Sequence, residues 1–177
     1  MASRFLLTVF AAGAVLLAGC GDDKKDSSSS RSVSGTGYSL DRPQDWQNGT
    51  KQGRRQGVFN FDLVLVKPRK PFNTNVNILR AKAPGVDIDD LRKGYRGELD
   101  SIGATGVTAS KPIRVDGDAG ITYQYLKKTP SGDHVRGRQV LVVHDGVVHS
   151  ITLTAIEDQF ATADDEFDSM LSSWRWS

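Results

Sequence analysis

The sequence predicts an α+β fold in which one antiparallel β-sheet is flanked by helices. In residues 38–177, short runs of alternating apolar and polar residues are joined by tight turns, which is the pattern of antiparallel strands. Two other segments of this region place apolar residues three or four positions apart, which is the spacing of an amphipathic helix. Residues 38–177 are therefore expected to form one compact domain.

The first residues of the chain are typical of an export signal. The apolar run Phe5–Leu17 follows a short segment with one positive charge, and it is too short to span a bilayer, which needs about 20 residues. The next residues complete the tetrapeptide Leu17-Ala18-Gly19-Cys20, which resembles the bacterial lipobox. This resemblance implies cleavage between Gly19 and Cys20, an S-diacylglyceryl group on Cys20 and an acyl group on its new amine. Alternatively, Cys20 is an ordinary apolar residue of a plain signal peptide or of an uncleaved anchor.

A flexible tether is expected at residues 20–37, after the signal peptide at 1–19. Serine, glycine and mixed charges dominate this stretch, and Val33 is its single sizeable apolar side chain. Such a segment buries too little surface to offset its ordering entropy. A tether of this length has a reach on the order of 20 to 25 Å. The sequence thus predicts a domain held by lipid at the extracytoplasmic face of the cell membrane.

The charge and the single cysteine exclude several classes of protein. There are 23 Lys and Arg residues against 21 Asp and Glu, and the net charge of +2 is too small for a nucleic-acid-binding protein. One cysteine excludes a disulfide scaffold and a zinc site with several thiolates. We therefore expect no nucleic-acid partner and no cofactor.

The domain is expected to begin with three strands and a helix. Strands are predicted at 38–40, 58–67 and 75–82, with a polar, glycine-rich loop at 48–57. In the second strand Phe59, Phe61, Leu63 and Leu65 alternate on one face, while Val64 and Val66 make its second half apolar on both faces. This half should be covered on both sides. A helix at 87–102 has Asp87 as its N-cap and ends before Gly103.

Four strands and a second helix complete the predicted domain. The strands are expected at 107–115, 121–127, 136–144 and 147–156, the last two forming a hairpin closed at Asp145-Gly146. The helix spans 162–174, with Ala163, Phe167, Met170, Leu171 and Trp174 on its apolar face.

Two short motifs in this order of elements resemble the PsbP-like superfamily. They are the opening Tyr-x-Leu-x-x-Pro-x-x-Trp at Tyr38, Leu40, Pro43 and Trp46, and the last helix with its Ser173-Trp174-Arg175 ending. The superfamily includes an extrinsic photosystem II subunit, a Ran-binding nuclear import factor and small bacterial lipoproteins, among them the actinobacterial LpqN type. The resemblance implies an α-β-α sandwich and a non-catalytic binding or assembly role. It implies no common ligand.

Two groups of polar residues are candidate sites. His144, Asp145 and His149 lie around the predicted hairpin turn and could hold a divalent metal, or the histidines could simply occupy an exposed hairpin end. Six cations, Lys51, Arg54, Arg55, Lys67, Arg69 and Lys70, border the strand at 58–67. If the two loops converge, they could meet anionic headgroups or an acidic partner; otherwise they are solvated loop charges.

Three functions remain open from the sequence. The leading hypothesis is a non-enzymatic envelope lipoprotein that binds a protein partner or an envelope component, since no motif for nucleophilic or nucleotide chemistry is found. A metal-dependent or hydrolytic enzyme would use His144, Asp145 and His149. A small-molecule or glycolipid carrier would need a deep apolar pocket between sheet and helix.

Overall fold

The computed structural model describes residues 31–55 and 61–177, which form a sheet-dominated fold with three α-helices. The strands are β1 Ser32–Gly35, β2 Tyr38–Asp41, β3 Gln47–Asn48, β4 Leu63–Lys67, β5 Thr74–Lys82, β6 Lys111–Val115, β7 Asp118–Lys128, β8 His134–His144, β9 Val147–Ile156 and β10 Arg175–Trp176. The helices are α1 Thr50–Arg55, α2 Ile88–Ser101 and α3 Phe160–Ser172, and α3 is preceded by a 3₁₀ turn at Glu157–Gln159.

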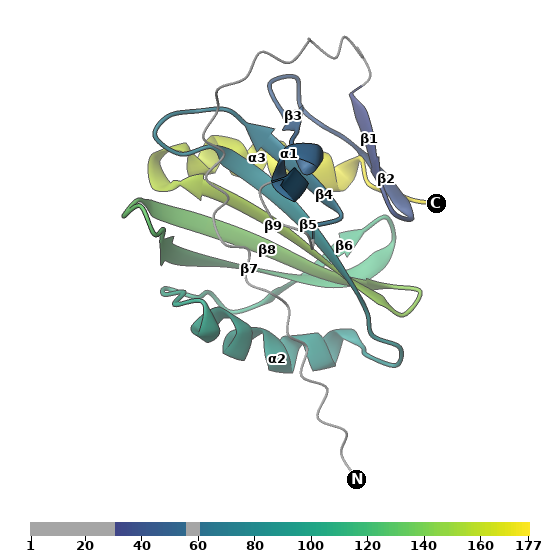
Figure 1. Cartoon of the computed structure of the whole chain (residues 1–177). Helices are drawn as coiled ribbons and strands as arrows, with labels where there is room; N and C mark the ends of the chain where they lie inside the picture. Colours follow the sequence, from purple (N-terminus) through teal and green to yellow (C-terminus); the bar gives the residue numbers. More distant parts are fainter. Residues whose placement is uncertain (1–30, 56–60) are drawn as a thin grey trace.

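All strand pairs are antiparallel, as predicted. The large sheet has seven strands in the order β3-β4-β5-β9-β8-β7-β6, and a small sheet has the order β1-β2-β10 (Figure 1). Short turns join β6 to β7 and β8 to β9, which explains their antiparallel pairing. The predicted α+β class with antiparallel strands is confirmed.

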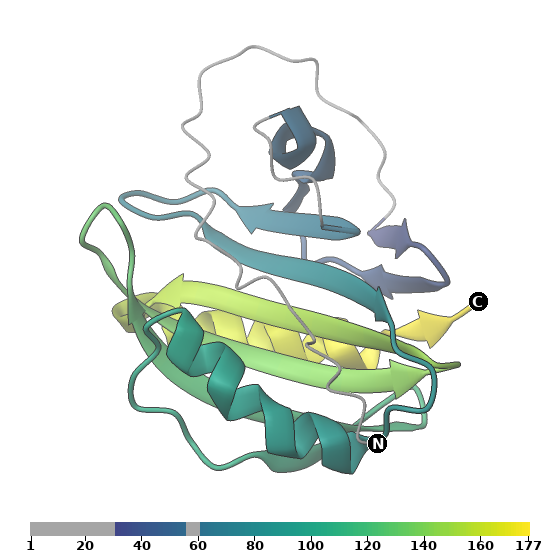
Figure 2. The same ribbon diagram turned by 60° about the horizontal axis from the view of Figure 1, so that its bottom comes forward.

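The large sheet carries one long helix on each face (Figure 2). Val140 and Val142 of β8 belong to the apolar cluster that contains the buried face of α3, whereas Leu141 belongs to the cluster that contains the buried residues of α2. Neighbouring residues of a strand point to opposite faces, so α2 and α3 cover opposite sides.

Several local predictions are confirmed. Asp87 caps α2, because its carboxylate accepts hydrogen bonds from the backbone N–H groups of Asp89 and Asp90. The turn between β8 and β9 has positive φ at both central residues, 48° at Asp145 and 70° at Gly146, as a tight two-residue hairpin requires. The predicted apolar stripe of α3 is buried.

Three short elements differ from the prediction. Ser32–Gly35 was expected to belong to the tether but pairs with β2, so the ordered domain begins before residue 38. Thr50–Arg55 was expected to be loop but forms α1, and β10 follows the last predicted helix. Elements of two to six residues have too little periodicity to be read from sequence, because tertiary pairing stabilises them.

Two predicted strands have different limits. The strand expected at 58–67 begins at Leu63. Phe59 lies outside the described residues. Phe61 was expected on the same face as Leu63, but it packs with Val64 and Val66. Asp62 lies in a bend, so the alternation does not continue across it. The strand expected at 107–115 begins at Lys111.

Candidate functional site

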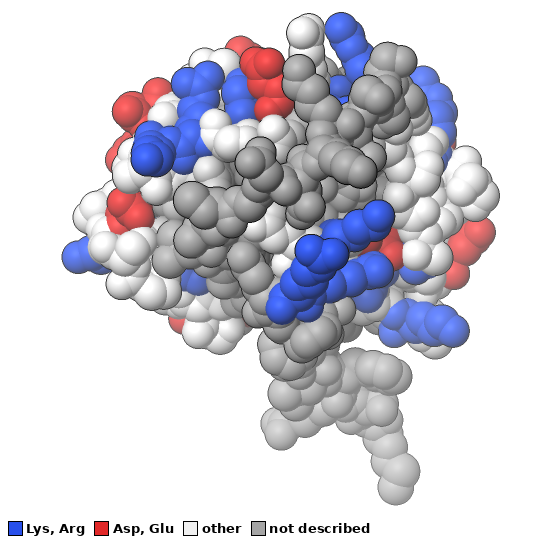
Figure 3. Space-filling model, turned by 45° about the horizontal axis from the view of Figure 1, so that its top comes forward, with Lys and Arg blue, Asp and Glu red and all other residues white. Residues whose placement is uncertain are grey.

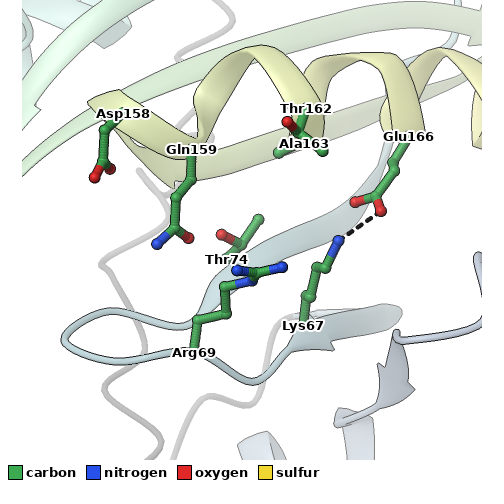
Figure 4. A pocket seen from close by; sticks show the side chains of 8 residues that line it. All are labelled: Lys67, Arg69, Thr74, Asp158, Gln159, Thr162, Ala163 and Glu166. Carbon is green, nitrogen blue, oxygen red and sulfur yellow. Dashed lines mark hydrogen bonds and ion pairs between the residues drawn. The ribbon is translucent and has the colours of Figure 1, made fainter.

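A polar cavity of about 120 Å³ lies where the β4–β5 hairpin meets the first turns of α3 (Figure 4). Side chains from both elements point into the space between them. The lining residues are Lys67, Arg69, Thr74, Asp158, Gln159, Thr162, Ala163 and Glu166.

Local geometry brings these residues together. Lys67 and Thr74 are direct partners in the β4–β5 register, so they stand side by side at the end of the hairpin. Thr162 and Glu166 are four residues apart on one face of α3, and Gln159 ends the 3₁₀ turn that precedes this helix. The cavity thus has a strand side and a helix side that are far apart in sequence.

An ion pair joins the two sides of the cavity. The Lys67 ammonium lies 2.5 Å from Glu166 Oε1, and the Trp46 indole N–H donates to Glu166 Oε2 over 2.9 Å. The side chains of Lys67 and Glu166 are 9% and 23% exposed. An ammonium has three N–H groups, and no hydrogen bond with the described residues uses the other two of Lys67. Both oxygens of Glu166 thus have a partner, whereas Lys67 keeps donors for another partner.

Further polar groups at the cavity are unpaired within the described residues. The Arg69 side chain makes no ion pair there, and Arg69 is exposed. Gln159 Oε1 is shielded from water and has no hydrogen-bond partner. In Figure 4 both side chains point toward the space between hairpin and helix. The arrangement is suited to holding a small polar group.

Lys67 does not share a surface with the predicted cations of α1. Lys51, Arg54 and Arg55 are exposed on α1, which packs through Gly53 against Val64. Lys67 points to the opposite face of β4, toward Glu166, and is buried. Lys67 is therefore removed from the predicted group of six cations, because residues 64 and 67 of β4 face opposite sides. On the side of the molecule in Figure 3, Lys and Arg side chains form separate groups with acidic side chains among them.

The two hairpin histidines are not direct partners across the β8–β9 turn. The register pairs His144 with Val147 and His149 with Val142. His144 stacks on Trp176, with ring centroids 4.1 Å apart; its Nδ1 lies 2.7 Å from Asp118 Oδ2 and its Nε2 lies 3.6 Å from Asp145 Oδ2.

His149 has a different environment from His144. It is buried, and its Nε2 accepts a hydrogen bond from Arg80 Nε over 3.3 Å. Burial and, as a smaller cause, the nearby Arg80 charge together lower the pKa of His149 to about 4. No group of three His, Cys, Asp or Glu side chains within residues 31–55 and 61–177 is placed to hold a metal ion.

Sequence reasoning missed most of the cavity. Of its lining residues only Lys67 and Arg69 were predicted to belong to a binding site, and as part of a surface patch. The sequence contained two signals for it. Lys67 continues an apolar strand, and Glu166 lies one position before Phe167, a residue of the apolar face of α3. The predicted lipidation residues Gly19 and Cys20 lie outside the described residues. In the part of the chain that the structure describes, no helix is long and apolar enough to cross a membrane.

Two solved structures have a similar fold. The chain matches LpqN of Mycobacterium tuberculosis with a TM-score of 0.63 and 16% identity, over 77% of this chain and 81% of that one. It matches the cyanobacterial PsbP of Synechocystis with a TM-score of 0.61 and 19% identity, over 89% and 98%. The fold of this chain is thus similar to that of the cyanobacterial PsbP.

These matches establish the fold and leave the function to be proposed. LpqN is described as involved in cell envelope biogenesis, which is a statement about that protein. A structure from Bacteroides thetaiotaomicron also matches, with a TM-score of 0.53 and 12% identity, over 80% of this chain and 45% of that one. No protein-family model and no curated protein matches the sequence.

Proposed function

We propose that this chain is a lipid-anchored protein of the extracytoplasmic face of the cell membrane, whose PsbP-like domain has a non-catalytic binding or assembly role. Its partner would be a protein or another component of the envelope. The observation that supports the anchor is the tetrapeptide Leu17-Ala18-Gly19-Cys20 at the end of an apolar run of signal-peptide length. Two or three acyl chains make a stable membrane anchor, whereas a single chain binds only marginally.

Metabolic labelling with an alkyne fatty acid tests the anchor. Wild-type protein should incorporate the label and fractionate with membranes, whereas Cys20→Ala should do neither. Ser27→Ala, in the predicted tether, is the matched control and should label as wild type does. The anchor is rejected if wild type takes up no label, or if Cys20→Ala labels equally.

The binding role draws support from two observations. Similar folds occur in LpqN, described as an envelope biogenesis protein, and in cyanobacterial PsbP. In addition, α1 presents exposed Lys51, Arg54 and Arg55 and contains no acidic residue. A helix with three exposed cations favours contact with an acidic surface.

Charge reversal combined with crosslinking tests this role. A photoreactive residue placed at Gln52 of α1 should crosslink to one dominant partner in native membranes, and Arg54→Glu with Arg55→Glu should abolish that product. Arg92→Glu with Arg96→Glu on α2 is the matched control and should leave it unchanged. Loss of the product in both double variants would show non-specific charge attraction and would refute a role for α1.

Nothing specific in the described residues favours the two alternative functions. His144 and His149 are engaged by Asp118 and Arg80, so the proposed hydrolytic or metal-dependent group is not assembled. A carrier would need space between helix and sheet, but at the α3 interface Phe167 and Leu153 are completely shielded from water. These side chains fill the contact that a lipid tail would have to enter.

A further inference from the structure

We propose that the cavity between the β4–β5 hairpin and α3 binds a single monoanionic oxyanion group, such as a carboxylate or a phosphodiester. Arg69 would provide the main contact and Lys67 a second one. The proposal concerns a different surface from the exposed cations of α1, and it does not depend on the lipid anchor.

The cavity has donors that no acceptor of the described residues uses. Lys67 gives one N–H to Glu166 and keeps two. The Arg69 guanidinium has five N–H groups and no ion pair with the described residues. The hydroxyl of Thr74, which is 1% exposed, adds another donor at the same hairpin end. A ligand that accepts several hydrogen bonds would satisfy these groups.

The buried position of Lys67 distinguishes this site from an ordinary surface charge. Lys67 is 7% exposed, so its spare N–H groups have little access to bulk water. A buried donor without a partner costs free energy, and a ligand oxygen would remove that cost. Gln159 is the second unpartnered group, and its carboxamide can rotate to present its NH₂ to a ligand oxygen.

The charges around the cavity select a monoanion over a dianion. Lys67 and Arg69 are balanced by Asp158 and Glu166 among the lining residues. Glu166 is neutralised by Lys67, which leaves Arg69 as the cation available for a ligand and Asp158 as an exposed carboxylate nearby. A dianion would carry one charge without a partner next to that carboxylate.

The size of the cavity agrees with one small group. A water molecule occupies about 30 Å³ of the liquid, so about four waters would fill a cavity of about 120 Å³. A carboxylate or a phosphodiester with its nearest atoms fits this volume, whereas an acyl chain does not. The rest of a larger ligand would extend past exposed Arg69 into solvent.

The indole N–H of Trp46 provides a local probe of occupancy. It donates to Glu166 Oε2, and Glu166 Oε1 contacts Lys67, so a ligand on Lys67 should shift its NMR resonance. The full-length protein in detergent would be titrated with sodium acetate, sodium dimethyl phosphate and inorganic phosphate at constant ionic strength. Trp46→Phe assigns the signal.

The expected result is saturable binding of acetate and dimethyl phosphate in the millimolar range, with inorganic phosphate at pH 8 weaker. Arg69→Gln should weaken binding of the monoanions about tenfold, because it removes one charge-assisted contact. Lys70→Gln, in the same exposed loop but outside the cavity, should change it less than twofold.

A vesicle experiment distinguishes a free ligand from a lipid headgroup. If Arg69→Gln but not Lys70→Gln weakens binding of the Cys20→Ala protein to phosphatidylglycerol vesicles, the phosphodiester of a lipid is the source. If the vesicles do not bind and the soluble monoanions do, the ligand is free. The proposal is overturned if no probe moves the Trp46 signal, if inorganic phosphate binds more tightly than the monoanions, or if both variants weaken binding equally.

Discussion

Two ion pairs of this protein have the same length but different exposure, and they should differ in energy. Lys67 and Glu166 are 2.5 Å apart with side chains 9% and 23% exposed, whereas Arg92 and Asp89 are 2.5 Å apart with side chains 47% and 63% exposed. We predict that a double-mutant cycle on the first pair gives a coupling free energy of about 2 kcal/mol, which is typical of shielded charged hydrogen bonds. The second cycle should give about 0.5 kcal/mol or less.

The loss of stability in each single variant depends on the polar group that the variant leaves without a partner. Lys67→Met keeps the buried stem but leaves the Glu166 carboxylate with the Trp46 N–H as its remaining partner. This should cost about 3 kcal/mol, at the lower end of the range for broken buried pairs because Glu166 still touches water. Glu166→Gln keeps an oxygen for Trp46 and should cost about 2 kcal/mol. The double variant removes both charges and should cost less than the sum.

Urea unfolding at pH 7, followed by circular dichroism, measures the four members of each cycle. Arg92→Gln and Asp89→Asn supply the exposed pair as the control on an independent helix. Equal coupling in the two cycles would refute the reasoning, because it would show that exposure does not set the strength of these pairs. A coupling below 1 kcal/mol for Lys67 and Glu166 would have the same consequence.

Other predictions concern pH and glycine. Burial raises the pKa of Glu98 to about 7 from 4.5. Its contribution to stability is therefore present below pH 4.5 and lost as the pH rises to 7. Glu98→Gln should raise the free energy of unfolding by about 2 kcal/mol at pH 8 and leave it unchanged at pH 4. The pKa of His149 is lowered by burial to about 4 from 6.5, so His149→Gln should flatten the loss of stability between pH 6.5 and pH 4, when unfolding is measured at each pH. A Cβ on Gly137 would lie 2.3 Å from the Tyr125 ring, so Gly137→Ala should lower the free energy of unfolding by about 3 kcal/mol. Gly94 of α2 has open space around its Cβ position, so Gly94→Ala should raise the free energy of unfolding by about 1 kcal/mol. Equal effects of the two variants in urea unfolding would contradict the contact with Tyr125.

Long periodic segments of this fold could be predicted from sequence because their own residues specify them. In α2 the stripe Leu91, Tyr95 and Leu99 is buried and Asp87 forms the cap, so both the face and the start are encoded locally. The β8–β9 turn is likewise specified by two residues that tolerate positive φ. By contrast, β10 contains only Arg175 and Trp176 and exists because β2 lies beside it.

The cavity could not be predicted because its two halves meet only in the folded chain. Lys67 and Glu166 are 99 residues apart, and no local pattern fixes which strand end meets which turn of α3. The sequence groups Lys67 with exposed Arg69 and Lys70 because all three lie at or just beyond the end of the same apolar strand. Lys67 is still the last residue of β4, and the alternation of side chains along the strand directs it to the same face as Leu63 and Leu65. Arg69 lies beyond the end of that strand and is exposed.

A charged residue within the apolar face of a helix nevertheless indicates that a partner lies opposite it in the fold. Glu166 lies between Ala163 and Met170 on the face of α3 that packs on the sheet, where an unpaired carboxylate would be costly. Its position therefore requires a partner on the facing strands, and the partner must be a donor near a strand end, since strand interiors there are apolar. Lys67 meets both conditions, and so does the Trp46 indole N–H just before β3. Once the topology is known, the pairing follows from the sequence; without the topology, every basic residue at a strand end remains a candidate.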